Sequence, residues 1–126
     1  MTSARRTGLL NLLGYAPPQL ELAFATKALR RISENEVIAK RELGHAVAKR
    51  LRHRLADLRA LTSVAEVFTL YGKECGLNES EVFISLGDGL AIVLSANHNK
   101  NPCSGAGQIS WSKVRRVKIE RITDSS

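Results

Sequence analysis

Alternating apolar and polar residues predict the strands of this chain. Residues 20–24, Leu-Glu-Leu-Ala-Phe, alternate directly after a pair of prolines and predict a first strand. Two further strand-like runs cover residues 81–86 and 90–94, and the Gly-Asp-Gly sequence at residues 87–89 between them is typical of a tight turn. We therefore expect these two runs to form a β-hairpin.

Helix signals fill the segment between the first strand and the hairpin. Thr26 predicts the N-cap of a short helix that reaches Arg31. Ser33 and Glu36 have the spacing of a capping box, in which each side chain accepts a hydrogen bond from the other residue's backbone N–H. A second, longer helix is thus expected to begin within residues 34–36.

The second predicted helix carries an apolar stripe on one side and many cations on the others. It runs towards Leu61, and Gly44 within it costs about 1 kcal/mol relative to alanine, which indicates a break or a kink. The stripe must be buried, and it consists of Val47, Leu51, Leu55 and Leu58.

A last strand is expected from Val114 to Ile122, after a polar loop at residues 97–107. Val117 and Ile119 should face the core. The predicted order is β-α-α-β-β-β, an α+β architecture with the helices packed on one face of a small antiparallel sheet. A chain of 126 residues, 44% of them apolar, is long enough for one such core.

The positive charge is concentrated in two segments. The formal net charge is +7; residues 26–61 hold ten Lys or Arg against four Asp or Glu, and residues 113–121 hold five against one. Residues 62–97, between them, hold one Lys against five acids. Clustered cations favour polyanionic partners through the release of counterions, although a solvated helix face gives the same composition.

The two cysteines, Cys75 and Cys103, lie far apart and lack CxxC spacing, which excludes a disulfide framework and the usual structural zinc site. We expect no metal and no cofactor, and a reducing, cytoplasmic compartment. No stretch approaches the roughly 20 apolar residues of a membrane span, so no membrane partner is expected. One domain should cover residues 19–124, preceded by a flexible N-terminal extension at residues 1–18.

Four strings, in order along the chain, resemble one protein family. Residues 20–30, 53–60, 92–98 and 109–114 are similar to segments of the RelE/ParE/HigB toxin superfamily, and in particular to the HigB-like "plasmid maintenance system killer" proteins. Each string is weakly specific alone, but together they stay in register over residues 20–124.

The resemblance implies a RelE-like fold and the toxin component of a type II toxin–antitoxin pair. Such a toxin is a ribosome-dependent endoribonuclease that cuts mRNA without a metal and so inhibits translation. The implied partners are the mRNA on the ribosome and a helix-turn-helix antitoxin, with operator DNA bound only through the antitoxin complex.

Two departures from the family pattern fall on positions that the resemblance assigns to chemistry. The strand after the turn usually begins Gly-Tyr-Arg, whereas this chain has Gly89, Leu90 and Ala91. Many relatives end with an Asp-Tyr-His-like tail, whereas this chain has Thr-Asp-Ser-Ser at residues 123–126. The arginine best suited to stabilise the phosphate is therefore missing at position 91.

Cutting RNA without a metal requires a base for the 2′-hydroxyl, a cation for the pentavalent phosphate and an acid for the leaving oxygen. We select as catalytic candidates Lys73, His98 and Arg121. The residues expected to contact RNA are Lys49, Arg52, Lys100, Lys113 and Arg115. Without a bulge, positions 113, 115 and 121 would share one face of the last strand.

Other interpretations stay open. An ordinary loop residue is the favoured interpretation of His98, and core packing rather than a base-stacking platform is the favoured interpretation of Trp111. At the level of function, a ParE-like toxin would bind gyrase without catalysis. A degenerate homologue would keep antitoxin binding and lose activity.

Overall fold

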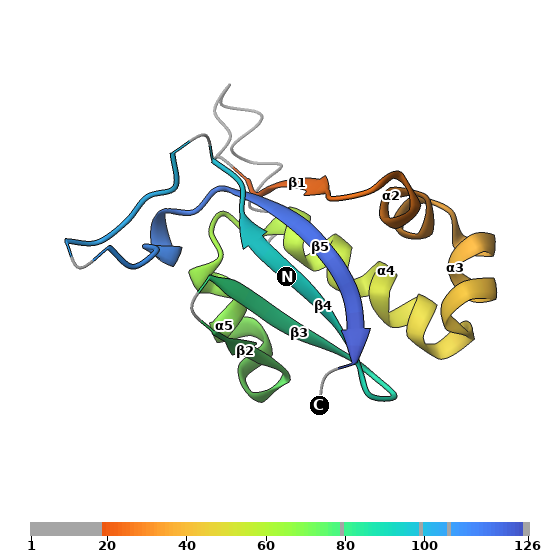
Figure 1. The fold of residues 1–126 in the computed structure, drawn as a ribbon. Helices are drawn as coiled ribbons and strands as arrows, with labels where there is room; N and C mark the ends of the chain where they lie inside the picture. The colour runs from red at the N-terminus through yellow and green to blue at the C-terminus, as the bar shows by residue number, and fades with distance from the viewer. Residues whose placement is uncertain (1–18, 79, 99, 106, 125–126) are drawn as a thin grey trace, which may run out of the picture.

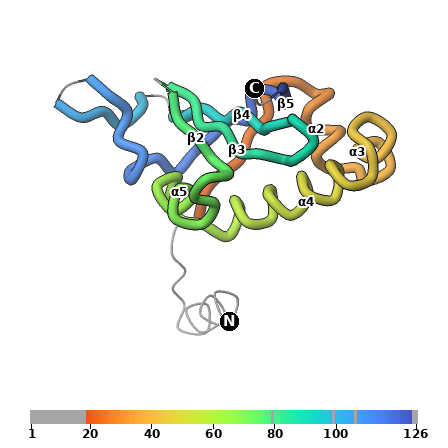
Figure 2. Tube along the Cα trace, turned by 90° about the horizontal axis from the view of Figure 1, so that it is seen from below, coloured from red at the N-terminus to blue at the C-terminus, as the bar shows by residue number. Residues whose placement is uncertain are grey.

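In a computed structural model, which describes residues 19–78, 80–98, 100–105 and 107–124, the chain forms two layers (Figures 1 and 2). One layer is a mixed five-stranded sheet, and the long helix α4 packs along one of its faces. In Figure 1, α4 passes behind the sheet, so the viewer looks on to the opposite, open face. The α+β class expected from the sequence is confirmed.

The elements are more numerous than the sequence predicted. The strands are β1 (Glu21–Phe24), β2 (Cys75–Leu77), β3 (Glu81–Gly87), β4 (Leu90–Ala96) and β5 (Arg116–Asp124). The helices are α2 (Lys27–Glu34), α3 (Glu36–Leu43), α4 (His45–Ala60) and α5 (Ala65–Tyr71), with short 3₁₀ helices η1 (Gly72–Glu74) and η2 (Trp111–Lys113). Compared with the structure, the predicted order β-α-α-β-β-β misses two elements, β2 and α5. It also treats α3 and α4 as one helix.

The strands are ordered β1-β5-β4-β3-β2 across the sheet. The last strand β5 lies between β4, to which it is antiparallel, and β1, to which it is parallel. The expectation of a purely antiparallel sheet was wrong at this pair.

The start of α2 follows the sequence signal, and α3 begins at Glu36, within the predicted range, but with a different capping residue. The Thr26 hydroxyl accepts a hydrogen bond from Leu29 N at 3.1 Å, as an N-cap should. At α3 the cap is Asn35, whose Oδ1 accepts from Ile38 N at 3.0 Å. The capping box predicted at Ser33 is wrong because α2 continues through Glu34, which leaves Ser33 inside the preceding helix.

Gly44 separates α3 from α4, as its position in the sequence indicated. Its φ of 86° lies in the region that favours glycine, and the chain turns there from one helix into the next. The apolar stripe of α4 is buried as predicted. It packs with Val82, Ile84, Leu86 and Ile92 of the hairpin in one core cluster.

The segment before β5 differs from the prediction. Residues 111–113 form η2, and β5 begins at Arg116 rather than at Val114. Val117 and Ile119 are buried, as expected. Val93 pairs with Arg121 while Leu94 pairs with Ile119, so Glu120 is an extra residue in the ladder.

These two differences overturn one structural expectation. Lys113 and Arg115 lie before β5, and the bulge at Glu120 shifts the register ahead of Arg121. The three cations therefore do not share a strand face. Trp111 opens η2 and packs, half-buried, against the core cluster, in line with the core-packing interpretation.

Candidate functional site

A hollow of about 440 Å³ lies at the β2 side of the sheet, over β2, β3 and β4. Phe83, Ser85 and Ala91 line it, and Lys73 and Glu74 of η1 stand at its margin. Ser85 pairs with Ala91 and lies one residue from buried Ile84 and Leu86, so alternation directs both side chains to the open face. Position 91, where the resemblance to HigB-like toxins leads one to expect an arginine, thus lies in the lining of this hollow.

Lys73 is the free cation of the hollow. Lys73 is exposed to solvent, and its ammonium group forms no ion pair with another described residue. Because η1 is tied to α4 by the contacts of the neighbouring Glu74, the lysine stem starts from a fixed backbone position. Lys73 is the catalytic candidate that the structure brings to position 91.

A half-buried arginine of α4, Arg54, supports the margin of the hollow from the helix side of the sheet. Arg54 Nε donates to the Ser85 carbonyl at 3.1 Å, and its Nη2 pairs with the Glu74 carboxylate. Its guanidinium also lies over the Tyr71 ring, 4.5 Å from the ring centre. The Arg54 side chain therefore joins α4, α5, η1 and β3 at one point.

Tyr71 extends this network to Asp57 on α4. Its hydroxyl donates to Asp57 Oδ2 at 2.8 Å. Burial, together with this hydrogen bond, raises the pKa of Tyr71 well above its usual range. The phenol consequently stays protonated and acts as a fixed donor.

Arg50 plays a similar part at the bulge in β3. The pairing of β3 with β4 shifts between Ser85 and Gly87, which leaves Leu86 as the extra residue. Arg50 Nη1 donates to the Leu86 carbonyl at 2.6 Å. Gly87 makes room for it, because a Cβ built there would lie 2.0 Å from Arg50 Nη1.

His98 and Arg121, the other two catalytic candidates, lie outside the lining of the hollow and have partners of their own. His98 Nε2 accepts from the backbone N–H groups of Arg115 at 3.0 Å and of Arg116 at 3.2 Å. Arg121 pairs through both of its terminal nitrogens with Glu81, at 3.0 and 3.1 Å, and this contact raises the pKa of Arg121. His98 thus organises the loop before β5, and the Arg121–Glu81 pair spans the intervening strand β4.

The residues predicted to contact RNA are spread over α4, the loop after β4, η2 and the segment between η2 and β5. Lys49 is exposed on α4, and Arg52 on the same helix pairs with Glu36 of α3 at 2.9 Å. Lys100 is exposed in the loop after β4, and Lys113 is exposed in η2. Arg115 is half-buried, and its Nη1 donates to the Ser112 carbonyl at 2.8 Å.

The three cations of β5 itself are neutralised by acids on neighbouring positions. The pairs are Arg116 with Glu21 at 3.5 Å, Lys118 with Glu120 at 3.6 Å, and Arg121 with Glu81 at 3.0 Å. Two of these acids come from other strands, β1 and β3. The basic character of residues 113–121 therefore does not translate into a row of unpaired cations on the open face.

Sequence reasoning missed Arg54, Glu74 and Ser85 as parts of this site. Arg50 and Arg54 are one helical turn apart, so they lie on the same side of α4. This spacing was the one sequence signal that both side chains could contact the same strand. Within the described ranges, no three His, Cys, Asp or Glu side chains are grouped as a metal site would need, and no helix is long and apolar enough to cross a membrane.

Comparison with known proteins adds no relative: no family model, no curated protein and no solved structure matches this chain.

Proposed function

We propose that this protein is the toxin component of a type II toxin–antitoxin pair, with a RelE/HigB-like fold, and that it cuts mRNA on the ribosome. The observation that carries the proposal is the hollow over β3 and β4, which combines an unpaired Lys73 with position 91. The resemblance of residues 20–124 to HigB-like toxins implies that the residue at position 91 lies where RNA is cut.

The lining residues suit part of the chemistry. In metal-free cleavage the 2′-oxygen attacks the adjacent phosphorus, the bond to the 5′-oxygen breaks, and a 2′,3′-cyclic phosphate forms. Among the lining side chains, Lys73 can stabilise the charge on the phosphate and donate a proton to the 5′-oxygen. Glu74, one oxygen of which pairs with Arg54, is the lining carboxylate that can accept the 2′-hydroxyl proton.

Controlled expression in bacteria with mapping of mRNA ends by primer extension tests this proposal. We expect growth arrest and new 5′ ends for the unaltered protein, and a loss of roughly 10²- to 10³-fold in cleavage for Lys73→Ala. Lys27→Ala removes an exposed lysine of α2, which does not line the hollow, and should cleave normally. A folded, abundant protein that produces neither arrest nor new ends would refute the proposal.

A second candidate is a toxin of the same scaffold that binds its target without cutting. Two observations favour this candidate. Position 91 in the hollow carries an alanine in place of a cation, and Arg121 is already paired with Glu81. Neither residue can then stabilise the charge on a phosphate in the hollow. A ParE-like protein of this kind would inhibit supercoiling by gyrase and leave mRNA intact. If neither activity is found but the protein co-purifies with an adjacently encoded helix-turn-helix protein, a degenerate toxin is indicated.

Restoring the family arginine separates these cases. Ala91 lines the hollow but is itself buried, so Ala91→Arg reaches the phosphate site only if its long side chain extends past its neighbours into the hollow. We expect cleavage to rise by roughly 10²-fold or more if the rest of the site is competent. Ala91→Met, an uncharged long side chain at the same place, is the matched control and should give no gain.

A further inference from the structure

A second hollow, of about 700 Å³, adjoins the hollow over β3 and β4 at the end of β2. Leu77, the last residue of β2, belongs to the lining of both, so the two hollows are neighbours. The other walls come from the turn between β2 and β3 and from the loop that leads into η2. Apolar, amide and hydroxyl side chains line this second hollow, and none of the described lining residues is charged.

Trp111, the only tryptophan of the chain, is the aromatic residue of the second hollow. It is half-buried and packs against the core cluster, which fixes its position, and its place in the lining leaves part of it open to the hollow. Its indole N–H donates to no described residue and is not among the buried unpaired groups of the described chain, so it reaches solvent. An aromatic side chain that is fixed on one side and open on the other is suited to stacking with a nucleobase.

Two side-chain amides stand in the same lining. Asn78 Oδ1 accepts from Ser80 N at 3.4 Å and from Glu81 N at 3.3 Å, so its oxygen is engaged and its amino group stays available as a donor. The Gln108 side chain is exposed and has no hydrogen bond to another described residue, whereas its backbone is held because Gln108 O accepts from Ser104 N at 2.7 Å. Free amide groups of this kind can pair with the hydrogen-bonding edge of an unpaired base.

The distribution of charge favours a base rather than a phosphate inside the second hollow. Its described lining is uncharged, but a lysine stands on either side: Lys73 in the hollow over β3 and β4, and Lys113 two residues after Trp111 in η2. Both lysines are exposed, and neither forms an ion pair with another described residue. Cations that alternate with an aromatic side chain are the arrangement by which proteins hold single-stranded nucleic acid.

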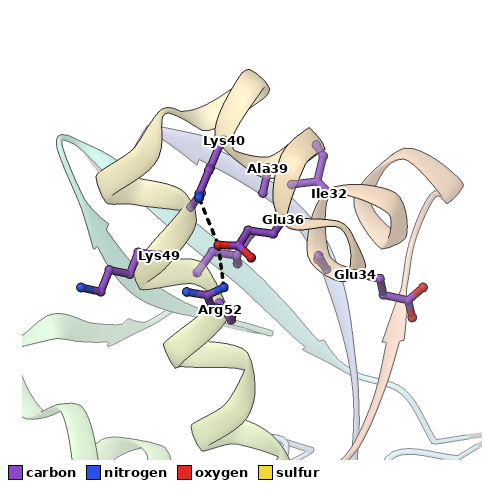
Figure 3. Close-up of a pocket in the computed structure, with 10 residues that line it drawn as sticks. Ile32, Glu34, Glu36, Ala39, Lys40, Lys49 and Arg52 are labelled. Atoms are coloured by element: carbon purple, nitrogen blue, oxygen red, sulfur yellow. Dashed lines mark ion pairs between the residues drawn. The ribbon is translucent and has the colours of Figure 1, made fainter.

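A third hollow, of about 240 Å³ between α2, α3 and α4, offers no such continuation (Figure 3). Two of its cations, Lys40 and Arg52, are already paired with Glu36, at 3.1 and 2.9 Å. Glu34 adds another carboxylate to the lining, and no lining residue is shared with the hollow over β3 and β4. Because these acids repel a polyanion, we expect a strand that leaves Lys73 to continue towards η2 rather than towards the helices.

From these contacts we infer that the second hollow is a pocket for one nucleobase of a single-stranded RNA whose backbone passes Lys73. The base stacks on the Trp111 indole, the amides of Asn78 and Gln108 meet its hydrogen-bonding edge, and Lys113 meets the adjoining phosphate. The inference rests on the proposed function, because it takes the RNA of that proposal as its ligand. It adds the form of the substrate, an unpaired base beside the phosphate at Lys73, since the bases of a duplex are stacked in its interior.

The fluorescence of Trp111 reports directly on this stacking, because no other tryptophan contributes to the emission. One probe is a 2′-O-methyl octauridylate, which cannot be cut because its attacking 2′-oxygen is blocked. The other is an abasic oligomer with the same sugar–phosphate chain. At about 0.05 M salt we expect the octauridylate to quench the emission and to bind roughly fivefold or more tightly than the abasic oligomer, which should leave the emission unchanged.

Four variants of the full chain locate the base. Gln108→Glu places a charge in the hollow with almost no change of shape and should weaken octauridylate binding by roughly three- to tenfold. Gln19→Glu, the same change at an exposed residue before β1, is the matched control and should leave binding unchanged. Trp111→Leu should weaken it by roughly 5- to 100-fold, and Trp111→Phe, which keeps a ring, should lose less. Anisotropy of the labelled octauridylate measures all four.

Three results would overturn the base pocket. The first two are an octauridylate that binds no more tightly than the abasic oligomer, and one that leaves the Trp111 emission unchanged. The third is an equal loss for Gln108→Glu and Gln19→Glu, which would reduce the effect to net charge; these two exposed changes decide the matter even if Trp111→Leu fails to fold.

The proposed function is judged separately, by the cleavage of mRNA in cells. Cleavage without quenching of Trp111 would overturn the base pocket alone. Quenching without cleavage would uphold the base pocket and overturn the cutting of mRNA.

Discussion

At the scale of single residues, the arginines of α4 show how one helix can serve both the interior and the surface. Arg50 and Arg54 turn towards β3 and donate to the carbonyls of Leu86 and Ser85. Arg52 turns the other way and pairs with Glu36. Long side chains allow this because their stems lie along apolar surface while the guanidinium reaches a distant acceptor.

Gly87 tests the contact between α4 and the β3 bulge. Gly87→Ala introduces a Cβ that meets Arg50 at a φ of 81°, so we expect a loss of about 2 to 4 kcal/mol in the free energy of unfolding. Gly89→Ala is the matched control, since Gly89 has a φ of 77° and nothing within 4 Å; it should cost about 1 kcal/mol. Urea unfolding measures both, and equal losses would show that Arg50 contributes nothing.

His98 is a second residue whose role is set by its acceptor atom. His98→Phe removes the acceptor of the Arg115 and Arg116 backbone N–H groups, and we expect a loss of about 1 to 2 kcal/mol. Hydrogen exchange should show faster exchange at these two amides. His53→Phe, on the exposed face of α4, should change stability by no more than about 0.5 kcal/mol; unchanged exchange in His98→Phe would contradict the structural role.

At the scale of elements, the N-terminus of α5 is stabilised by the side chain of Glu66, a residue inside the helix. Val64, the N-cap, has no side-chain cap, and Glu66 reaches back instead. Its Oε1 accepts from Thr62 N at 2.6 Å, from the Thr62 hydroxyl at 3.0 Å and from Ser63 N at 3.2 Å. One carboxylate thus satisfies three donors of the turn that leads into α5 and fixes that turn against the helix.

The capping carboxylate predicts a pH dependence. The hydrogen bond from Thr62 N, with those from the Thr62 hydroxyl and Ser63 N, holds the pKa of Glu66 below its ordinary value of 4.5. A folded-state pKa below the unfolded one stabilises the protein above pH 4.5, and this contribution is lost as the pH falls through the folded value.

Glu66→Gln should therefore cost about 0.5 to 1 kcal/mol at neutral pH, a modest effect because the carboxylate is exposed. The difference from the unaltered protein should vanish as the pH falls below 4.5 towards 3. Unfolding in urea at several pH values measures it. Glu34→Gln, at an exposed position without a described hydrogen bond, is the control, and a Glu66→Gln deficit that persists at pH 3 would contradict the capping role.

At the scale of the whole molecule, tertiary pairing redistributes the charge of the chain. Of the basic clusters seen in the sequence, the one on β5 is matched by Glu21, Glu81 and Glu120, whereas Lys73 comes from the acidic middle segment and stays unpaired. Net charge alone therefore does not indicate where a polyanion binds.

This redistribution predicts which cations release counterions on RNA binding. If RNA occupies the hollow over β3 and β4, Lys73→Ala should reduce the slope of log affinity against log salt by roughly 0.7. The double change Glu81→Gln with Arg121→Gln removes one ion pair without altering net charge, and it should leave the slope unchanged. Titration of labelled single-stranded RNA at several salt concentrations measures both, and a slope insensitive to Lys73 would place RNA elsewhere.

The sequence by itself determined the elements whose signals are local. Alternation predicted β1, and two strand-like runs around a Gly-Asp-Gly turn predicted the β3–β4 hairpin. The stripe of α4 predicted its buried face, and Thr26 and Gly44 marked helix boundaries. These features depend on neighbours within a few residues, so periodicity and capping chemistry are sufficient to locate them.

Only the tertiary structure decided the placement of the long side chains and the edges of the sheet. The parallel pairing of β1 with β5, the bulge at Glu120, and the partners of Arg54, His98 and Arg121 all join segments distant in sequence. A charged side chain has the same local sequence whether it faces water or a carbonyl across the core. Which of the two it meets depends on strand register, and register is set by the packing of the entire sheet on α4.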